Sequence, residues 1–183
     1  MCEHIMISSK NMKGNFNDFE IKIVNRQACN MDKCIFFDID GVLNKKSQWK
    51  RQYSLNDGCI KEFSSFTVRE CADLIMMSSW RSGFVATNST ENSPQIKELE
   101  SRFKECGVQI TDKTPILRGR TRDKEIERYL YLHKDIQFYT IIDDDPKEYG
   151  KKMKGLYLVD CTRGFSAVDA KRVQFVGRDA ECI

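Results

Sequence analysis

The sequence predicts an α/β fold built on a doubly wound parallel sheet. From Lys33 onward, short apolar runs alternate with segments of helical periodicity. Strands that alternate with helices favour right-handed crossovers and therefore a parallel sheet. The apolar runs are continuous, as expected of strands that are buried on both faces. The chain has 183 residues, which suits one domain of ordinary size.

Four apolar runs are predicted to be the central strands, and a shorter run is predicted to be a short strand. Each of the four central runs is four or five residues long, which is strand length, and polar or turn-forming residues follow it. The central strands are expected at Cys34–Phe37, Leu74–Met77, Phe138–Ile142 and Leu156–Asp160, and the short strand at Val108–Ile110.

Three helices are predicted between these strands. The first runs over 57–70, with Asn56 or Asp57 as its cap and Ile60 and Phe63 facing inward. The second runs over 95–105, because Ser93–Pro94 is a typical helix start and Gly107 a typical stop. The third continues to about His133, with Asp123 as its cap.

Residues 1–30 differ from the rest of the chain. They are polar and rich in Asn, and one alternating segment, Phe19–Val24, has the pattern of an edge strand. We expect residues 1–30 to be an appendage of unknown role and residues 31–183 to form the functional domain.

Composition excludes several classes of protein. Hydrophobic residues make up 40% of the chain and charged residues 31%, which is typical of a globular protein. The apolar runs are too short to span a bilayer, and the N-terminus lacks the apolar core of a signal peptide, so we expect a cytoplasmic location. The eight cysteines form no CxxC pair and neither histidine lies at zinc-ligand spacing from a cysteine pair, which favours reduced thiols.

Acidic and hydroxyl side chains follow three of the predicted strands. Asp38 and Asp40 come directly after the first strand, with Gly41 allowing a sharp turn, Ser78 follows the second, and Asp143–Asp145 ends the third. In a doubly wound sheet, ligands bind beyond the carboxyl ends of the strands. Clustered carboxylates with no His or Cys nearby favour Mg²⁺. The sequence therefore predicts a magnesium site at this edge.

These motifs resemble those of haloacid-dehalogenase-like (HAD) phosphatases. Asp38–Val42 resembles the DxDGV signature, Ser78 the second motif, and Asp143–Asp144 the acidic fourth motif. The sequences around Ser78–Arg81 and Arg122–Ile126 are more narrowly similar to the HAD domain of Swiss-Army-knife RNA repair proteins. The resemblance implies a Rossmann-like HAD core, and the short segments between motifs leave room for little or no cap domain.

The resemblance also implies a role for each matched residue. Asp38 is the expected nucleophile and Asp40 the expected proton donor and acceptor, with an aspartyl-phosphate intermediate. Mg²⁺ is expected on Asp38, the Asp40 carbonyl and Asp143, with Asp144 as an alternate ligand. For phosphate binding the resemblance implies a hydroxyl and a cation, and the matching residues are Ser78, Ser79, Arg122 and Lys124, with Arg120 as a further alternative for the cation.

The substrate is less well determined than the reaction. Lys45, Lys46, Trp49, Lys50 and Arg51 follow the nucleophile loop and are expected to rim the site. Cations beside an aromatic ring suit a phosphodiester backbone and a stacked base, although a solvated loop with Trp49 folded inward explains them equally well.

Trp80 and Arg81 follow the second motif and could bind substrate phosphate or simply pack and pair, and Arg81 is a further rim candidate. We expect nucleic-acid ends or nucleotides as substrates, and RNA repair or defence proteins as partners. The alternatives are a small-metabolite or protein phosphatase, and a non-catalytic binding module on the same scaffold.

Overall fold

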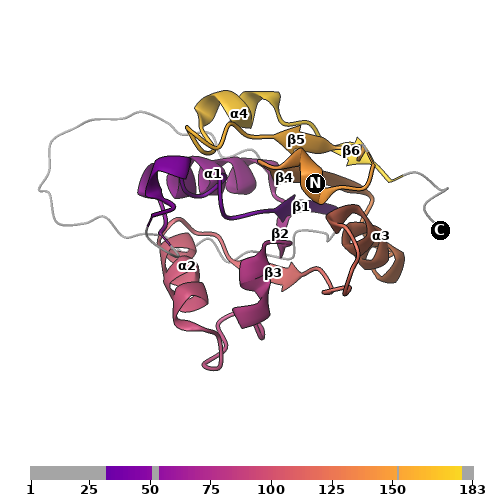
Figure 1. The fold of residues 1–183 in the computed structure, drawn as a ribbon, viewed down its shortest axis with the longest axis horizontal. Coiled ribbons are helices and arrows are strands. Elements are labelled where there is room, and N and C mark those ends of the chain that lie inside the picture. The colour runs from indigo at the N-terminus through magenta and orange to yellow at the C-terminus, as the bar shows by residue number, and fades with distance from the viewer. Residues whose placement is uncertain (1–31, 51–53, 152, 179–183) are drawn as a thin grey trace, which may run out of the picture.

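The computed structural model describes residues 32–50, 54–151 and 153–178. Within them, six strands form one sheet in the order β3-β2-β1-β4-β5, with β6 beside β4 (Figure 1). The pairings along β3-β2-β1-β4-β5 are all parallel, and only β6 is antiparallel to its neighbour. The predicted doubly wound parallel sheet is therefore confirmed. The strands are β1 (Lys33–Phe37), β2 (Asp73–Met76), β3 (Ile110–Lys113), β4 (Phe138–Asp143), β5 (Leu156–Leu158) and β6 (Val176–Gly177).

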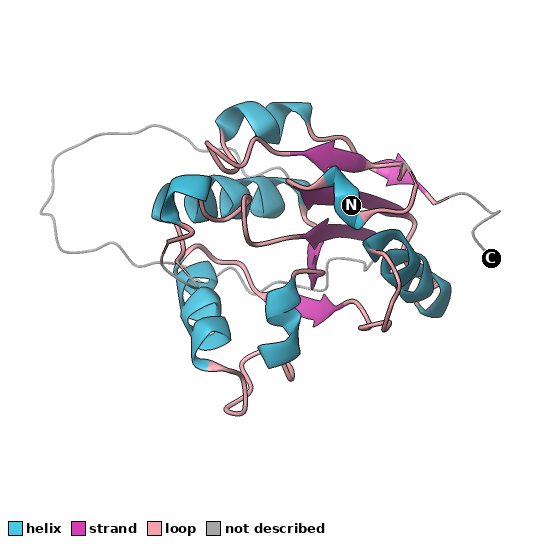
Figure 2. Ribbon diagram, viewed as in Figure 1, coloured by secondary structure: helices cyan, strands magenta, loops and turns pink. Residues whose placement is uncertain are grey.

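Four α-helices cover the two faces of this sheet (Figure 2), again counting the described residues alone. Residues of α1, α2 and α4 share one apolar core with Ile35 and Phe37 of β1. Residues of α3 share a second core with Cys34 and Phe36, which point to the opposite face because side chains alternate along a strand. The helices are α1 (Asp57–Glu70), α2 (Pro94–Glu105), α3 (Arg122–Leu132) and α4 (Ala167–Arg172).

The first helix shows why the longer elements could be predicted. Asn56 caps α1 through its side chain, which accepts a hydrogen bond from the Cys59 amide. Ile60 and Phe63, one turn apart, are both buried, and the helix ends where Cys71 adopts a left-handed conformation. The predicted bounds of α1 are confirmed, and those of α2 are correct to one residue.

Other local predictions were wrong or incomplete. The N-cap of α3 is Thr121, not Asp123, whose carboxylate instead accepts a hydrogen bond from the Gly150 amide. The strand expected at 108–110 begins only at Ile110 and continues through polar residues to Lys113. Neither α4 nor β6 was expected, and the strand predicted at Phe19–Val24 lies outside the described residues.

The order of the strands fixes where a ligand can bind. The chain proceeds from β1 outward to β3, then returns to the other side of β1 and continues through β4 to β5. Strand order therefore reverses between β1 and β4, and in doubly wound sheets the crevice beyond this point is the usual binding site. No cap domain interrupts the described segments between these elements, and no helix among them is long and apolar enough to cross a membrane.

Candidate active site

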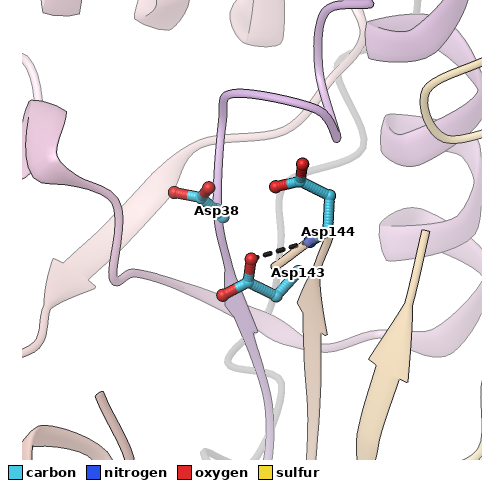
Figure 3. Close-up of side chains that lie close together, drawn as sticks. All are labelled: Asp38, Asp143 and Asp144. Atoms are coloured by element: carbon cyan, nitrogen blue, oxygen red, sulfur yellow. Dashed lines mark hydrogen bonds between the residues drawn. The ribbon is translucent and has the colours of Figure 1, made fainter. Parts of the chain in front are cut away.

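Three carboxylates meet at the point where the strand order reverses. Asp38 directly follows β1, Asp143 ends β4, and Asp144 is the next residue (Figure 3). One carboxylate oxygen from each side chain lies within 4.8 Å of the others. The pairing of β1 with β4 extends into the site, because the Asp38 amide donates to the Ile142 carbonyl at 3.0 Å. The sheet itself thus holds Asp38 beside Asp143.

Asp143 is fully buried and has hydrogen-bond donors on both oxygens. Oδ1 accepts from the backbone amides of Asp144 at 2.7 Å and Asp145 at 3.0 Å. Oδ2 accepts from the Tyr149 hydroxyl at 2.7 Å and from Arg122 Nη1 at 2.5 Å. Buried carboxylates need such compensation, and here it also fixes the orientation of the side chain.

Arg122 is the cation of the cluster. It is the first residue of α3, and Nη1 lies 2.5 Å from Asp143 Oδ2 and 3.4 Å from Asp38 Oδ1. Burial alone would lower the pKa of Arg122, but Asp38 and Asp143 raise it above its ordinary value, so the guanidinium stays charged. If all three carboxylates were ionised, Arg122 would leave two negative charges among them uncompensated, which matches the charge of one divalent cation.

Burial shifts the pKa of two of these carboxyl groups upward. For Asp38, loss of solvation raises the pKa to about 7; Arg122 opposes the rise, Asp143 adds to it, and a hydrogen bond with Ser78 opposes it. For Asp144, burial and the charge of Asp143 raise the pKa to about 6. Asp38 Oδ1 is buried and makes no hydrogen bond with the described residues. The site is therefore short of positive charge, as expected of a metal-binding pocket.

Gly41 lets the loop after β1 pass close to Asp144. Its φ of +77° is readily adopted only by glycine, and a Cβ atom there would overlap the Asp144 carboxylate. Ser78 follows β2 by two residues, is 1% exposed, and its hydroxyl accepts from the Trp80 amide at 3.4 Å. The loop and the buried hydroxyl thus border the carboxylate cluster on the sides of β1 and β2.

Comparison with known families identifies this arrangement. A family model described as the HAD domain in Swiss Army Knife RNA repair proteins matches residues 34–170. The chain belongs to this HAD family. The match contains every acidic, hydroxyl and basic residue described above, and membership supports assignment as a HAD-type phosphohydrolase. No curated protein matches the chain.

The HAD site brings together most, but not all, of the residues that were predicted for it. Arg122 lies on the acidic cluster, whereas Lys124 is exposed and pairs with Glu127 at 2.7 Å. Arg120 and Ser79 are also exposed. Among the cations left open for phosphate binding, the geometry therefore favours Arg122.

Arg81 is buried away from solvent. It is 6% exposed, its Nη2 lies 2.5 Å from Glu125 Oε2, and its Nη1 donates to the carbonyls of Met77 and Ser78. Glu125 in turn accepts from the Leu117 amide at 3.0 Å. Of the two roles considered for Arg81, packing and pairing fits this geometry, and a place on the substrate rim does not.

The residues predicted to form a basic rim follow the loop after β1, as a 3-10 helix and a turn. Lys45 is half-buried, Lys46 and Lys50 are exposed, and Trp49 is 43% exposed. The indole N–H of Trp49 donates to Asn44 Oδ1 at 3.0 Å, so the side chain is held at the base of the loop and remains partly exposed. Arg51 lies outside the described residues.

Two residues of the site, Tyr149 and Asn44, were not given a role from the sequence, and Trp80 was given only the alternatives of binding substrate phosphate or packing. Tyr149 donates to Asp143, and Asn44 and Trp80 both donate to the Asp40 carboxylate. Trp80 lies 40 positions from Asp40, and no sequence periodicity relates them. Asn44 lies two residues after the DxDGV segment, which is a local signal for a place near the site.

Proposed function

We propose that this chain is a magnesium-dependent phosphate monoester hydrolase that works through an aspartyl-phosphate and acts on nucleic-acid ends or nucleotides. The observation that carries the proposal is the meeting of Asp38, Asp143 and Asp144 within 4.8 Å, with Arg122 on two of them. Phosphoryl transfer depends mainly on positioning and on neutralising charge, and this cluster provides both.

The reaction would proceed in two displacements. A carboxylate oxygen of Asp38 attacks phosphorus, the bond to the leaving oxygen breaks, and Asp40 donates its proton to that oxygen. A water then attacks the aspartyl-phosphate while Asp40 takes up its proton, and the bond between phosphorus and the Asp38 oxygen breaks. Arg122 and Ser78 are placed beside Asp38, where a guanidinium and a hydroxyl suit the phosphate oxygens.

The donor set fits magnesium. Asp38, Asp143 and the Asp40 carbonyl would hold the ion, with Asp144 as an alternate ligand, and all of these are the hard oxygen donors that Mg²⁺ prefers. When bound, Mg²⁺ neutralises charge on the phosphate and the carboxylates. Two observations support this assignment: Asp38 Oδ1 is buried and makes no hydrogen bond with the described residues, and three carboxylates gather around one guanidinium.

Magnesium is expected to raise the melting temperature of the wild-type protein. At a concentration about 100 times Kd, a ligand adds about 2.7 kcal/mol, and each kcal/mol raises the melting temperature of a chain this long by about 2–4 °C. Replacing Asp143 by Asn should remove the response to Mg²⁺, whatever it does to the starting melting temperature. Differential scanning fluorimetry with and without MgCl₂ measures both.

Asp145→Asn is the matched control for this experiment. Asp145 belongs to the same acidic triplet, but its carboxylate accepts from the Lys147 amide and caps a short 3-10 helix. This variant should keep the magnesium response. A wild-type protein that Mg²⁺ does not stabilise, or an Asp143→Asn variant that still responds, would refute the proposed metal site.

The rim residues support a nucleic-acid substrate. Exposed Lys46 and Lys50 flank Trp49, whose ring is fixed by Asn44 next to the loop that carries Asp40. Lysines bind the phosphate backbone and an exposed aromatic face stacks on a base. Without a cap domain in the described segments, a polymer end could reach the site.

Neutralising the rim lysines is expected to lower activity on oligonucleotide substrates selectively. In a Lys46→Gln, Lys50→Gln double variant, kcat/KM on 3′- or 5′-phosphorylated oligonucleotides should fall. The slope of log(kcat/KM) against log[salt] should become less steep by about 0.7 for each phosphate contact that is lost. Turnover of p-nitrophenyl phosphate should change little, because that substrate has no backbone to bind.

Lys104→Gln with Lys134→Gln is the matched control. Both lysines are exposed and precede the starts of β3 and β4, so they lie toward the opposite edge of the sheet. This control variant should keep wild-type activity on both substrates. Equal losses on oligonucleotides and on the aryl phosphate in the rim variant would instead favour a small-molecule phosphatase.

A further inference from the structure

Two N–H donors hold the carboxylate of Asp40, one on each oxygen. Asn44 Nδ2 donates to Oδ1 at 2.8 Å, and Trp80 Nε1 donates to Oδ2 at 3.0 Å. The donors come from different parts of the fold, since Asn44 ends the loop after β1 and Trp80 lies in the 3-10 helix after β2. Together they prevent the carboxylate from rotating about its own axis without losing a hydrogen bond.

Asn44 is itself fixed on every side. It is 1% exposed, and its Oδ1 accepts from the Gly41 amide at 2.8 Å and from Trp49 Nε1 at 3.0 Å. Its Nδ2 donates to Asp40 and, at 2.9 Å, to the Ser54 carbonyl. A side-chain amide has two donor hydrogens and two acceptor lone pairs, so Asn44 uses its full capacity. Because Oδ1 already accepts two N–H groups, the amide cannot flip without losing them.

Trp80 is fixed by packing. It is 5% exposed and belongs to the apolar core beneath α1 and α2, two residues after Ser78. A buried indole has little freedom to move, so its N–H is presented to Asp40 in one direction.

We propose that Asn44 and Trp80 are positioning residues that hold Asp40 for proton transfer to the leaving group. This inference rests on the proposed hydrolase function. A carboxylate has about four acceptor positions, and the two N–H donors fill one on each oxygen. The acidic proton must therefore take the remaining position on one of the two oxygens, so the donors decide the direction from which Asp40 meets the leaving oxygen. Proton transfer needs this alignment, since a positioned acid accelerates a reaction by about 10²–10⁴-fold.

Trp80→Phe tests the proposal, because it removes the N–H and keeps an aromatic ring. Single-turnover release of the leaving group is measured with excess enzyme on two substrates. One is an alkyl phosphate, whose alkoxide is a poor leaving group that needs the proton, and the other is 2,4-dinitrophenyl phosphate, whose phenolate leaves without it. We expect the alkyl phosphate to react about tenfold more slowly, the cost of about one hydrogen bond to a charged group. The dinitrophenyl ester should change less than about threefold.

Tyr129→Phe is the matched control, and Asn44→Ala is a second test variant. Tyr129 is also 5% exposed and donates to a carboxylate, that of Asp112 at 3.0 Å, but it lies outside the site. Removing the Tyr129 hydroxyl should slow the reaction of neither substrate. Asn44→Ala should repeat the selective loss on the alkyl phosphate. Equal losses on both substrates, or no loss, in the Trp80 and Asn44 variants would overturn the inference while leaving the hydrolase proposal in place.

A wild-type protein inactive on both substrates would overturn the hydrolase proposal and this inference with it.

Nuclear magnetic resonance gives a readout independent of turnover, because the chain has two tryptophans and both donate into this network. In Asp40→Ala, the Trp80 indole N–H should shift and exchange faster with solvent. An indole resonance that does not respond to this substitution would contradict the hydrogen bond on which the inference depends.

Discussion

Replacing Asp38 with Asn is expected to abolish magnesium-dependent phosphate release, with a loss of about 10⁴-fold or more. An amide is a poor nucleophile and cannot form the acyl phosphate that the two-step reaction requires. The substitution keeps the shape of the side chain and the hydrogen bond from the backbone amide of residue 38 to Ile142. The loss should therefore be chemical and not a consequence of unfolding. Phosphate release from p-nitrophenyl phosphate, measured with MgCl₂ present, tests this.

The same variant has a second expected effect, on stability without metal. Burial raises the pKa of Asp38 from an ordinary 3.8 to about 7. A carboxyl group whose pKa is higher in the folded than in the unfolded protein stabilises the fold while it is protonated. This stabilisation is complete below the pKa of the unfolded protein and is lost as the pH rises through about 7. An amide has no such dependence, so Asp38→Asn should gain stability relative to wild type between about pH 4 and 7.

Thermal melting of the metal-free wild type and variant at pH 5 and pH 8 measures this difference, and Asp145→Asn again serves as the control. Retained turnover in Asp38→Asn would refute the covalent mechanism. A variant that is inactive because it no longer melts cooperatively would be recognised in the same melting curves.

The fold was predictable from sequence wherever local signals agreed with tertiary packing. Helix α1 has a capping residue, an apolar stripe and a clear end, and its bounds were predicted without error. Helix α4 has only six residues, too few to show a periodicity, and it forms because Ser166 and Asp169 close a capping box at its start. Strand β3 is polar along most of its length, so its pairing with β2 could not be inferred from apolar content.

The acidic part of the site was predictable for a similar reason. Carboxyl ends of neighbouring parallel strands lie at one edge, so acids after β1 and β4 had to approach one another once the sheet was assumed. The sequence could not decide whether Arg122 or Lys124 faces the cluster. Side chains two residues apart on a helix point in nearly opposite directions, and the register of α3 against the sheet decides which one faces the cluster.

The partners of the acidic and basic groups could not be predicted, because they are distant in sequence. Arg81 follows the second motif and suggests a phosphate ligand, yet Glu125, 44 positions later, pairs with it in the interior. Trp80, its neighbour, reaches Asp40 instead. Only the folded arrangement of β2, α3 and the loop after β1 shows that Arg81 pairs with Glu125 and that Trp80 contacts Asp40.

Replacing Asp40 with Asn is expected to lower turnover by about 10²–10⁴-fold and to trap the aspartyl-phosphate. With a good leaving group the first displacement can still proceed, but an amide cannot accept the proton of the attacking water. Acid-quenched samples should therefore retain protein-bound phosphate that hydroxylamine releases, in an amount that approaches one per chain. Asp38→Asn combined with Asp40→Asn should bind none, and absence of the phosphoenzyme in Asp40→Asn alone would contradict the assignment of Asp40 to the second step.

The hydrogen bonds of Asp40 predict a further consequence of this substitution. Both carboxylate oxygens accept N–H groups, from Asn44 and from Trp80, so an amide at position 40 must turn its NH₂ toward one of these donors. Asn44 cannot flip to relieve the conflict, since Gly41 and Trp49 already occupy its oxygen. Trp80→Phe should therefore cost less stability in the Asp40→Asn background than in wild type. A double-mutant cycle by chemical denaturation measures that coupling, which we expect to be about 1 kcal/mol, and additive effects would show that the two side chains do not interact.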